Sequence, residues 1–300
     1  MRIIDRGSGP PIVVIPGIQG RWEWMKPAID ALAQRGRVIT FSLADEPTCR
    51  GQFEEAQGFW CYVEQVRQAL DESGIDRASI CGVSYGGLIA AAFAVRHPDR
   101  VNSLVLVSAL PPSWQPDERV TFYLRFPWLL TPLFCLGSLR LYREIAAANE
   151  GWWGGVTAAM SHGINVLRHM FHPGRMARRV HLLSSVRIEA DLARVQLPVL
   201  VVTGEDALER VVPPRMTRRY LDLWPHARTA TIARTGHLGL ITRPAEFAAV
   251  VSTFAAEHAS QALDDALPDP GSPPPDLEPR VPGPASPIPD RYVVPRRSIG

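Results

Sequence analysis

The sequence has almost no excess of charge of either sign and very little lysine. Its 32 lysine and arginine residues nearly balance 30 aspartate and glutamate residues, which gives a formal net charge of +2 at pH 7. A chain so close to neutral is not expected to bind nucleic acid or a membrane surface through charge. Lys26 is the only lysine, and we give this bias toward arginine no functional weight.

Cysteine is also scarce. The four cysteines form no CxxC pair and have no histidine at metal-ligand spacing, which argues against a zinc site or a disulfide framework. The simplest interpretation is a cytoplasmic protein with reduced thiols, without a metal or a cofactor. The cysteines are Cys49, Cys61, Cys81 and Cys135.

Long hydrophobic runs are missing as well. The N-terminal residues lack the charged and then apolar pattern of a signal peptide. The most apolar stretch, residues 126–139, is too short to cross a bilayer and is interrupted by Pro127 and Pro132. We therefore expect no integral membrane segment.

The chain has 300 residues, 46% of them hydrophobic, and its C-terminal part differs in composition from the rest. From residue 267 to the end, 34 residues contain 11 of the 28 prolines. Residues 261–300 are therefore predicted to be a disordered tail. Its PxxP-like spacing could bind an aromatic groove of a partner protein, and the simpler alternative is a solvated tail.

Before the tail, short apolar runs alternate with helical patterns, which indicates an α/β fold with a mostly parallel central sheet flanked by helices. Residues 111–195 contain helical patterns and no strand-like run. We therefore predict a core of residues 1–110 and 196–260, with 111–195 inserted as a helical cap. The expected strands are 12–15, 37–41, 78–81, 101–108, 199–203 and 228–233, and the expected helices of the core are 25–34, 58–73, 86–96, 214–223 and 245–258.

One tight turn carries a pattern typical of a nucleophilic serine. Ser84 lies in a G-x-S-x-G sequence between the predicted strand 78–81 and the helix that follows. A serine on a strained strand-to-helix turn needs small neighbours, here Gly82 and Gly86, for its hydroxyl to be exposed above the sheet.

A serine hydroxyl needs a base, and the base needs an acid that orients it. His237 follows the last predicted strand, where it can reach over the sheet toward Ser84. The loop after strand 199–203 carries three candidate acids, Glu205, Asp206 and Glu209, and the residues alone leave the choice open.

Four motifs in this order resemble the α/β-hydrolase fold family, in its serine-nucleophile, esterase-like branch with a helical cap. They are PGIQG at 16–20, GVSYGG at 82–87, the stretch from PVLVVTGED to VVPP at 198–214, and RTGHLGL at 234–240, and the resemblance covers about residues 1–260. It implies that Ser84 is the nucleophile and His237 the general base. It also implies an oxyanion hole formed by the backbone N–H groups of Tyr85 and Ile18, with Gln19 as an additional candidate.

The chain departs from the family pattern at three places. Ala207 stands where the family usually has its aspartate, and counting back from Val212-Pro213 gives Glu209, which we favour over Asp206 as the acid. Pro16 replaces the histidine that commonly precedes the oxyanion glycine. Before the central strand, only residues 2–5 could form another strand. The sequence therefore leaves open whether the first edge strand is absent.

Serine at the elbow favours cleavage of an ester, lactone or thioester of an apolar small molecule through an acyl-enzyme. The alternatives are a carbon–carbon bond hydrolase or acyltransferase with the same residues, and a non-catalytic binding protein on the same fold. The basic run 175–179 is interpreted as a solvated helix face, or else as a site for an acidic substrate group or a membrane surface. Candidate substrate-binding residues, which could equally pack the cap, are Trp128, Phe134, Trp152 and Trp153.

Overall fold

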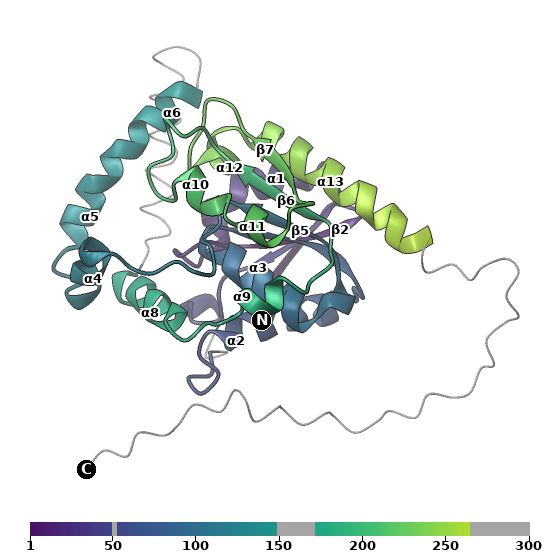
Figure 1. Cartoon of the computed structure of the whole chain (residues 1–300), viewed down its shortest axis with the longest axis horizontal. Coiled ribbons are helices and arrows are strands. Elements are labelled where there is room, and N and C mark those ends of the chain that lie inside the picture. The colour runs from purple at the N-terminus through teal and green to yellow at the C-terminus, as the bar shows by residue number, and fades with distance from the viewer. Residues whose placement is uncertain (50–52, 149–171, 265–300) are drawn as a thin grey trace, which may run out of the picture. The chain divides into compact units, whose positions relative to one another are not determined.

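The computed structural model describes residues 1–49, 53–148 and 172–264, which belong to one compact unit. The last helix, α13 (Pro244–Asp264), continues past the predicted core boundary at residue 260. The remainder of the predicted tail lies outside the described residues, as do Trp152 and Trp153. Figure 1 shows the molecule with its elements labelled.

Seven strands form one sheet in the order β1-β3-β2-β4-β5-β6-β7. The β1 strand pairs antiparallel with β3, and all other neighbours are parallel. An edge strand therefore does form at the N-terminus, which answers the question that the sequence left open. The strands are β1 (Ile3–Arg6), β2 (Pro11–Ile15), β3 (Arg37–Phe41), β4 (Ala78–Val83), β5 (Val101–Val107), β6 (Val199–Thr203) and β7 (Arg228–Thr231).

Helices follow the parallel strands and cover both faces of the sheet. The core helices are α1 (Lys26–Leu32), α2 (Trp60–Glu72), α3 (Tyr85–Arg96), α10 (Pro214–Thr217), α11 (Tyr220–Leu223), α12 (Gly239–Thr242) and α13, with short 3-10 turns at η1 (Trp22–Met25), η2 (Pro47–Cys49) and η3 (Pro98–Arg100). The helix predicted over 214–223 is thus two short helices, α10 and α11.

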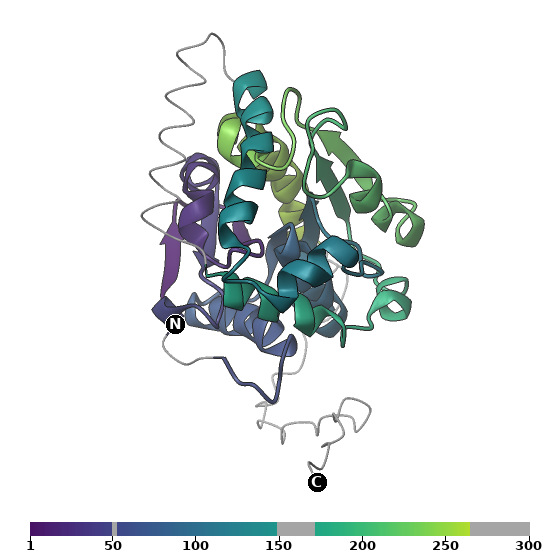
Figure 2. The same ribbon diagram turned by 90° about the vertical axis from the view of Figure 1, so that its left-hand side faces the viewer.

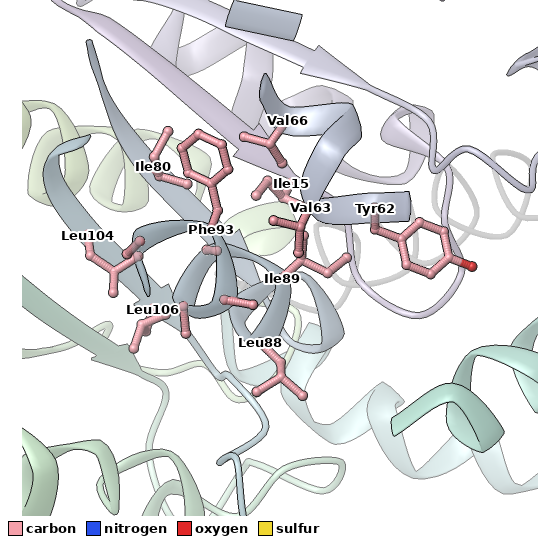
Figure 3. Close-up of a cluster of buried hydrophobic side chains, with 14 of the residues drawn as sticks. Ile15, Tyr62, Val63, Val66, Ile80, Leu88, Ile89, Phe93, Leu104 and Leu106 are labelled. Atoms are coloured by element: carbon pink, nitrogen blue, oxygen red, sulfur yellow. The ribbon is translucent and has the colours of Figure 1, made fainter. Parts of the chain in front are cut away.

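Alternate residues of the strands supply two separate cores. Val13 and Ile15 of β2 pack in the cluster that includes α2 and α3, whereas Ile12 and Val14 pack in the cluster that includes α1 and α13. This alternation arises because successive side chains of a strand point to opposite faces of the sheet. Figure 3 shows part of the first cluster, where Phe93 lies between the sheet and α2.

The described parts of the segment between β5 and β6 contain helices joined by turns and irregular stretches. Within 111–148 and 172–195 there is no strand, and the cap that the sequence analysis assigns to 111–195 stays a prediction. Its elements are α4 (Glu118–Arg125), α5 (Thr131–Gly137), η4 (Ser138–Leu141), α6 (Tyr142–Ala148), α8 (Pro173–Leu183) and α9 (Glu189–Leu192). Figure 2 shows the teal helices α4 to α6 in front of the core. None of the described helices combines the length and hydrophobicity that crossing a bilayer requires.

The parallel strands end at a common edge, and the predicted site residues follow those ends. The loop 16–20 follows β2, Ser84 follows β4, the loop with Glu209 follows β6 and the loop with His237 follows β7. Crevices at this edge of open α/β sheets are the usual place for a ligand.

Candidate active site

Ser84 occupies a strained turn between β4 and α3. Its backbone has φ 54° and ψ −115°, a conformation that residues other than glycine rarely adopt. The turn is held because the Ser84 N–H donates to the carbonyl oxygen of Val107 at the end of β5, over 2.8 Å. The sheet therefore maintains a backbone conformation that the isolated turn would not keep.

Close packing of backbone explains the glycines on either side of the serine. A Cβ atom on Gly86 would lie 2.5 Å from the carbonyl oxygens of Ile15 and Pro16, and a Cβ atom on Gly82 would lie 2.6 Å from the Cα atom of Gly87. No real Cβ atom comes so close to backbone. The G-x-S-x-G pattern is thus required by the approach of α3 to the end of β2.

The loop after β2 lies directly against Ser84. A Cβ atom on Gly17 would be 3.4 Å from the Cβ atom of Ser84, and the Gly20 N–H closes the turn on the Gly17 carbonyl over 2.9 Å. Neither Ile18 nor Tyr85 donates its backbone N–H to a carbonyl oxygen of the described residues. Two backbone donors therefore lie on the segments that flank the serine.

His237 and Glu209 are in hydrogen-bond contact. The Nδ1 atom of His237 lies 3.3 Å from Oε2 of Glu209, and the Glu209 side chain is 1% exposed. The other carboxylate oxygen, Oε1, accepts from the N–H groups of Val211 at 2.7 Å and Val212 at 3.0 Å. Burial by itself would raise the pKa of Glu209, but the hydrogen bond and charge of His237 and these two N–H groups outweigh it and lower the pKa.

The other two candidate acids have different partners. The side chain of Asp206 is 65% exposed and pairs with Arg218 at 3.3 Å. Oε1 of Glu205 accepts from the Arg234 N–H over 2.8 Å, which ties its loop to the loop before His237. Of the three carboxylates, the structure brings Glu209 to the histidine, because the turn closed by its N–H on the Glu205 carbonyl packs the Glu209 backbone against Gly236.

The basic run 175–179 is not a solvated helix face throughout. Arg179 of α8 is fully buried and donates to Ile18 O at 2.7 Å, Asp45 Oδ1 at 2.6 Å and Glu46 Oε1 at 2.6 Å. The interpretation of the whole run as solvated was wrong for Arg179, because a run of basic residues does not reveal which face of its helix is buried. This arginine connects the insertion to the loop after β2.

A second charged residue of the insertion reaches the site from α6. Glu144 is fully buried, and its Oε1 accepts from the Leu238 N–H over 2.6 Å. Sequence analysis missed this residue, because it lies in no motif and 94 positions before its partner.

Of the four predicted substrate-binding residues, the structure describes the side chain of Trp128. Trp128 is 61% exposed and contacts the edge of His172, with ring centroids 4.7 Å apart. Phe134 is in α5, and its side chain lies outside the described residues, as Trp152 and Trp153 do entirely.

Known proteins share this fold. A family model described as alpha/beta hydrolase fold matches residues 10–134, from β2 through the elbow and into the insertion. This chain has the α/β-hydrolase fold. The match includes the loop after β2 and the turn at Ser84, and the strand order found here completes the fold beyond it.

Solved structures and a curated relative agree with this α/β-hydrolase assignment. An esterase from Exiguobacterium antarcticum superposes with a TM-score of 0.68 at 15% identity, covering 84% of this chain and 94% of the esterase. An enol-lactonase from Burkholderia xenovorans LB400 superposes with a TM-score of 0.64 at 19% identity, covering 84% of this chain and 95% of the lactonase. The 2-hydroxymuconate semialdehyde hydrolase of Pseudomonas putida is 26% identical over 84% of this chain and 89% of its own length. These proteins are hydrolases that act on different bonds, so they support a hydrolase in general.

Proposed function

We propose that this α/β-hydrolase-fold protein is a serine hydrolase that cleaves ester-like bonds of an apolar small molecule. The observation that carries the proposal is the hydrogen bond between buried Glu209 and partly buried His237, at the same sheet edge as the strained Ser84. A buried carboxylate with a lowered pKa, bonded to Nδ1, fixes the histidine tautomer whose Nε2 can accept a proton.

The proposed reaction proceeds through an acyl-enzyme. Ser84 Oγ attacks the carbonyl carbon while His237 Nε2 takes the hydroxyl proton, and Glu209 stabilises the imidazolium that forms. The N–H groups of Ile18 and Tyr85 hold the oxyanion. His237 then returns the proton to the leaving alcohol as the C–O bond breaks. A water that gives its proton to His237 attacks the acyl-enzyme, and the acid is released as Ser84 regains the proton.

We propose that the insertion selects the acyl group. It begins and ends at β5 and β6, next to Ser84, and offers apolar side chains such as Phe122, 55% exposed, and Leu133, 50% exposed. Such a surface suits a substrate with an apolar acyl chain.

A second candidate reaction uses the same residues. The similarity to a 2-hydroxymuconate semialdehyde hydrolase favours cleavage of a carbon–carbon bond next to a carbonyl group as the alternative. Transfer of the acyl group to an alcohol or amine instead of water would also need no further residue.

The test is a comparison of wild type with Ser84→Ala on p-nitrophenyl esters of graded acyl length. We expect wild-type turnover with an optimum at one chain length, and a loss of at least about a thousandfold in kcat for the variant. A 2-hydroxy-6-oxo-dienoate substrate tested in parallel separates the two reactions. If wild type and Ser84→Ala are equally inert on both substrate classes but bind ligands, the chain is a binding protein and the proposal fails.

A further inference from the structure

The loop that carries His237 is held from the insertion by a buried carboxylate. Glu144 of α6 has no exposed surface, and its Oε1 lies 2.6 Å from the backbone nitrogen of Leu238, the residue after His237. The backbone N–H of Gly236, the residue before His237, also acts to lower the pKa of this carboxylate. One side chain of the insertion thus holds the histidine loop at the residue next to the imidazole.

Among the described residues, few charged groups surround Glu144 apart from those of the site itself. The ionisable groups that act on its carboxylate from facing loops are His237 and Glu209. Of the elements packed against α6, α12 carries no ionisable side chain, and in η4 the ionisable residue Arg140 is exposed. Burial raises the pKa of Glu144 to about 7, against the opposing effect of the two backbone N–H groups and His237. Within the described residues its Oε2 atom has no hydrogen-bond partner.

We infer that Glu144 is a positioning residue of the active site, through which the insertion fixes the His237 loop and adds negative charge beside the imidazole. The inference rests on the proposed function, since it concerns the base of that reaction. It assigns the insertion a part in assembling the site, in addition to selecting substrates.

The inference rests on two opposite effects of ionised Glu144: it lowers the stability of the folded protein and raises the rate of the reaction. A buried carboxylate without a cationic partner destabilises the folded protein when it is ionised. The same negative charge stabilises the imidazolium that forms when Ser84 gives up its proton. Substitution of Glu144 by glutamine keeps an oxygen acceptor for the Leu238 N–H and removes the charge, so the two effects can be measured separately.

The experiment measures the rate at which a fluorophosphonate probe labels Ser84 between pH 5.5 and 8.5. The serine oxygen forms a bond to phosphorus, fluoride leaves, and His237 takes the hydroxyl proton. The variants are Glu144→Gln, Glu144→Ala and, as a matched control, Glu189→Gln, which removes an exposed carboxylate of the same insertion. Ser84→Ala reports whether labelling occurs at the proposed nucleophile.

We expect the wild-type rate divided by the Glu144→Gln rate to be near one at pH 5.5, where Glu144 is neutral, and about fivefold or more at pH 8.5. The Glu144→Ala variant, which leaves the Leu238 N–H group unpaired, should label more slowly than wild type at every pH. The Glu189→Gln control should follow wild type within a factor of two.

A second measurement distinguishes positioning from a merely structural role. Because ionised Glu144 is unfavourable in the folded state, Glu144→Gln should raise the Tm by a few degrees at pH 8 and leave it unchanged near pH 3, well below the ordinary pKa of 4.5, where the carboxyl is protonated both folded and unfolded. A variant that is more stable yet slower supports the inference. A rate ratio that does not change with pH, or a lower Tm at pH 8, overturns it. If Ser84→Ala is labelled as fast as wild type, the proposed function fails instead.

Discussion

Arg179 and Ile18, 161 positions apart in the chain, are joined by a hydrogen bond of 2.7 Å from a buried guanidinium to a backbone carbonyl. The peptide units on either side of Ile18 share its Cα atom, so fixing its carbonyl restrains the direction of its N–H, the proposed oxyanion donor. The same guanidinium pairs with Asp45 and Glu46, whose side chains are each 1% exposed. The loop after β2 is therefore set by a residue of the insertion.

The first prediction concerns this arginine. Arg179→Met leaves the buried carboxylate of Asp45 without its cation and that of Glu46 with only Arg175, at 3.3 Å, and should lower the free energy of unfolding by about 3–5 kcal/mol. Arg179→Lys keeps the charge but cannot bond Ile18, Asp45 and Glu46 together, so we expect a folded protein with kcat reduced about tenfold or more. Urea unfolding and ester hydrolysis measure both quantities. Arg194→Met, at a side chain that is 83% exposed, is the control and should change neither. Wild-type kcat in a folded Arg179→Lys would contradict the prediction.

The second prediction separates the two acids that the sequence left open. Glu209→Gln should reduce kcat by about 10³ to 10⁴ with little change in KM, because an amide does not stabilise the imidazolium and can hold the wrong tautomer. Asp206→Asn removes only an exposed pair with Arg218 and should retain wild-type activity. Steady-state kinetics on the best p-nitrophenyl ester decides between them. Equal losses of kcat in the two variants would contradict a specific role of the hydrogen bond between Glu209 and His237 in the reaction.

The third prediction concerns the effect of pH on stability at Glu209. Its pKa in the folded protein lies below the ordinary value of 4.5, so its ionised form stabilises the fold above pH 4.5, and this stabilisation is lost as the pH falls through the lower folded pKa. Wild type should therefore exceed Glu209→Gln in stability most at pH 6 to 7, and the difference should shrink below pH 4. Urea titrations between pH 3 and 7 measure this. A difference that grows on acidification would have the wrong sign.

The fourth prediction tests the elbow. Gly86→Ala places a Cβ atom 2.5 Å from the carbonyl oxygens of Ile15 and Pro16 and must push α3 away from the loop after β2. We expect the variant to lose at least about 1–3 kcal/mol of stability and most of the activity. Gly74→Ala is the comparison, since its φ of +62° also strains an alanine but no atom lies within 4 Å of the added Cβ. It should cost about 1 kcal/mol and leave kcat unchanged. Loss of activity in both variants would refute a specific role for the close approach at Gly86.

Much of the fold follows from local signals in the sequence. The strands 37–41 and 199–203 are apolar runs with turn residues nearby, and the structure has them at the predicted bounds. The sequence left the β1 strand undecided because it is short and half exposed. Its pairing with β3 establishes the strand, which its own sequence pattern does not. The continuous helix predicted over 214–223 is interrupted between Thr217 and Tyr220, where periodicity alone shows no break.

The site was less predictable where it depends on tertiary contacts. Ser84 and His237 lie in motifs whose neighbours fix their local backbone, so a single sequence identifies them as candidates. The choice of Glu209 depends on the turn that the loop after β6 forms, so the spacing of the residues favours Glu209 but does not decide it. Glu144 and Arg179 come from insertion helices without a motif, and only the docking of those helices on the core brings them to the site loops.

The order of strands has a consequence for the chain as it is being synthesised. The first five strands in sequence, β1 to β5, are contiguous in the sheet, and β6 and β7 are added at one side of β5. A nascent chain can therefore complete the serine turn, with its support from Val107, before residue 209 leaves the ribosome. During that interval the proposed nucleophile has neither its proposed acid nor its proposed base, and if the proposed function holds, a half-made or truncated chain is expected to be unable to hydrolyse the esters around it.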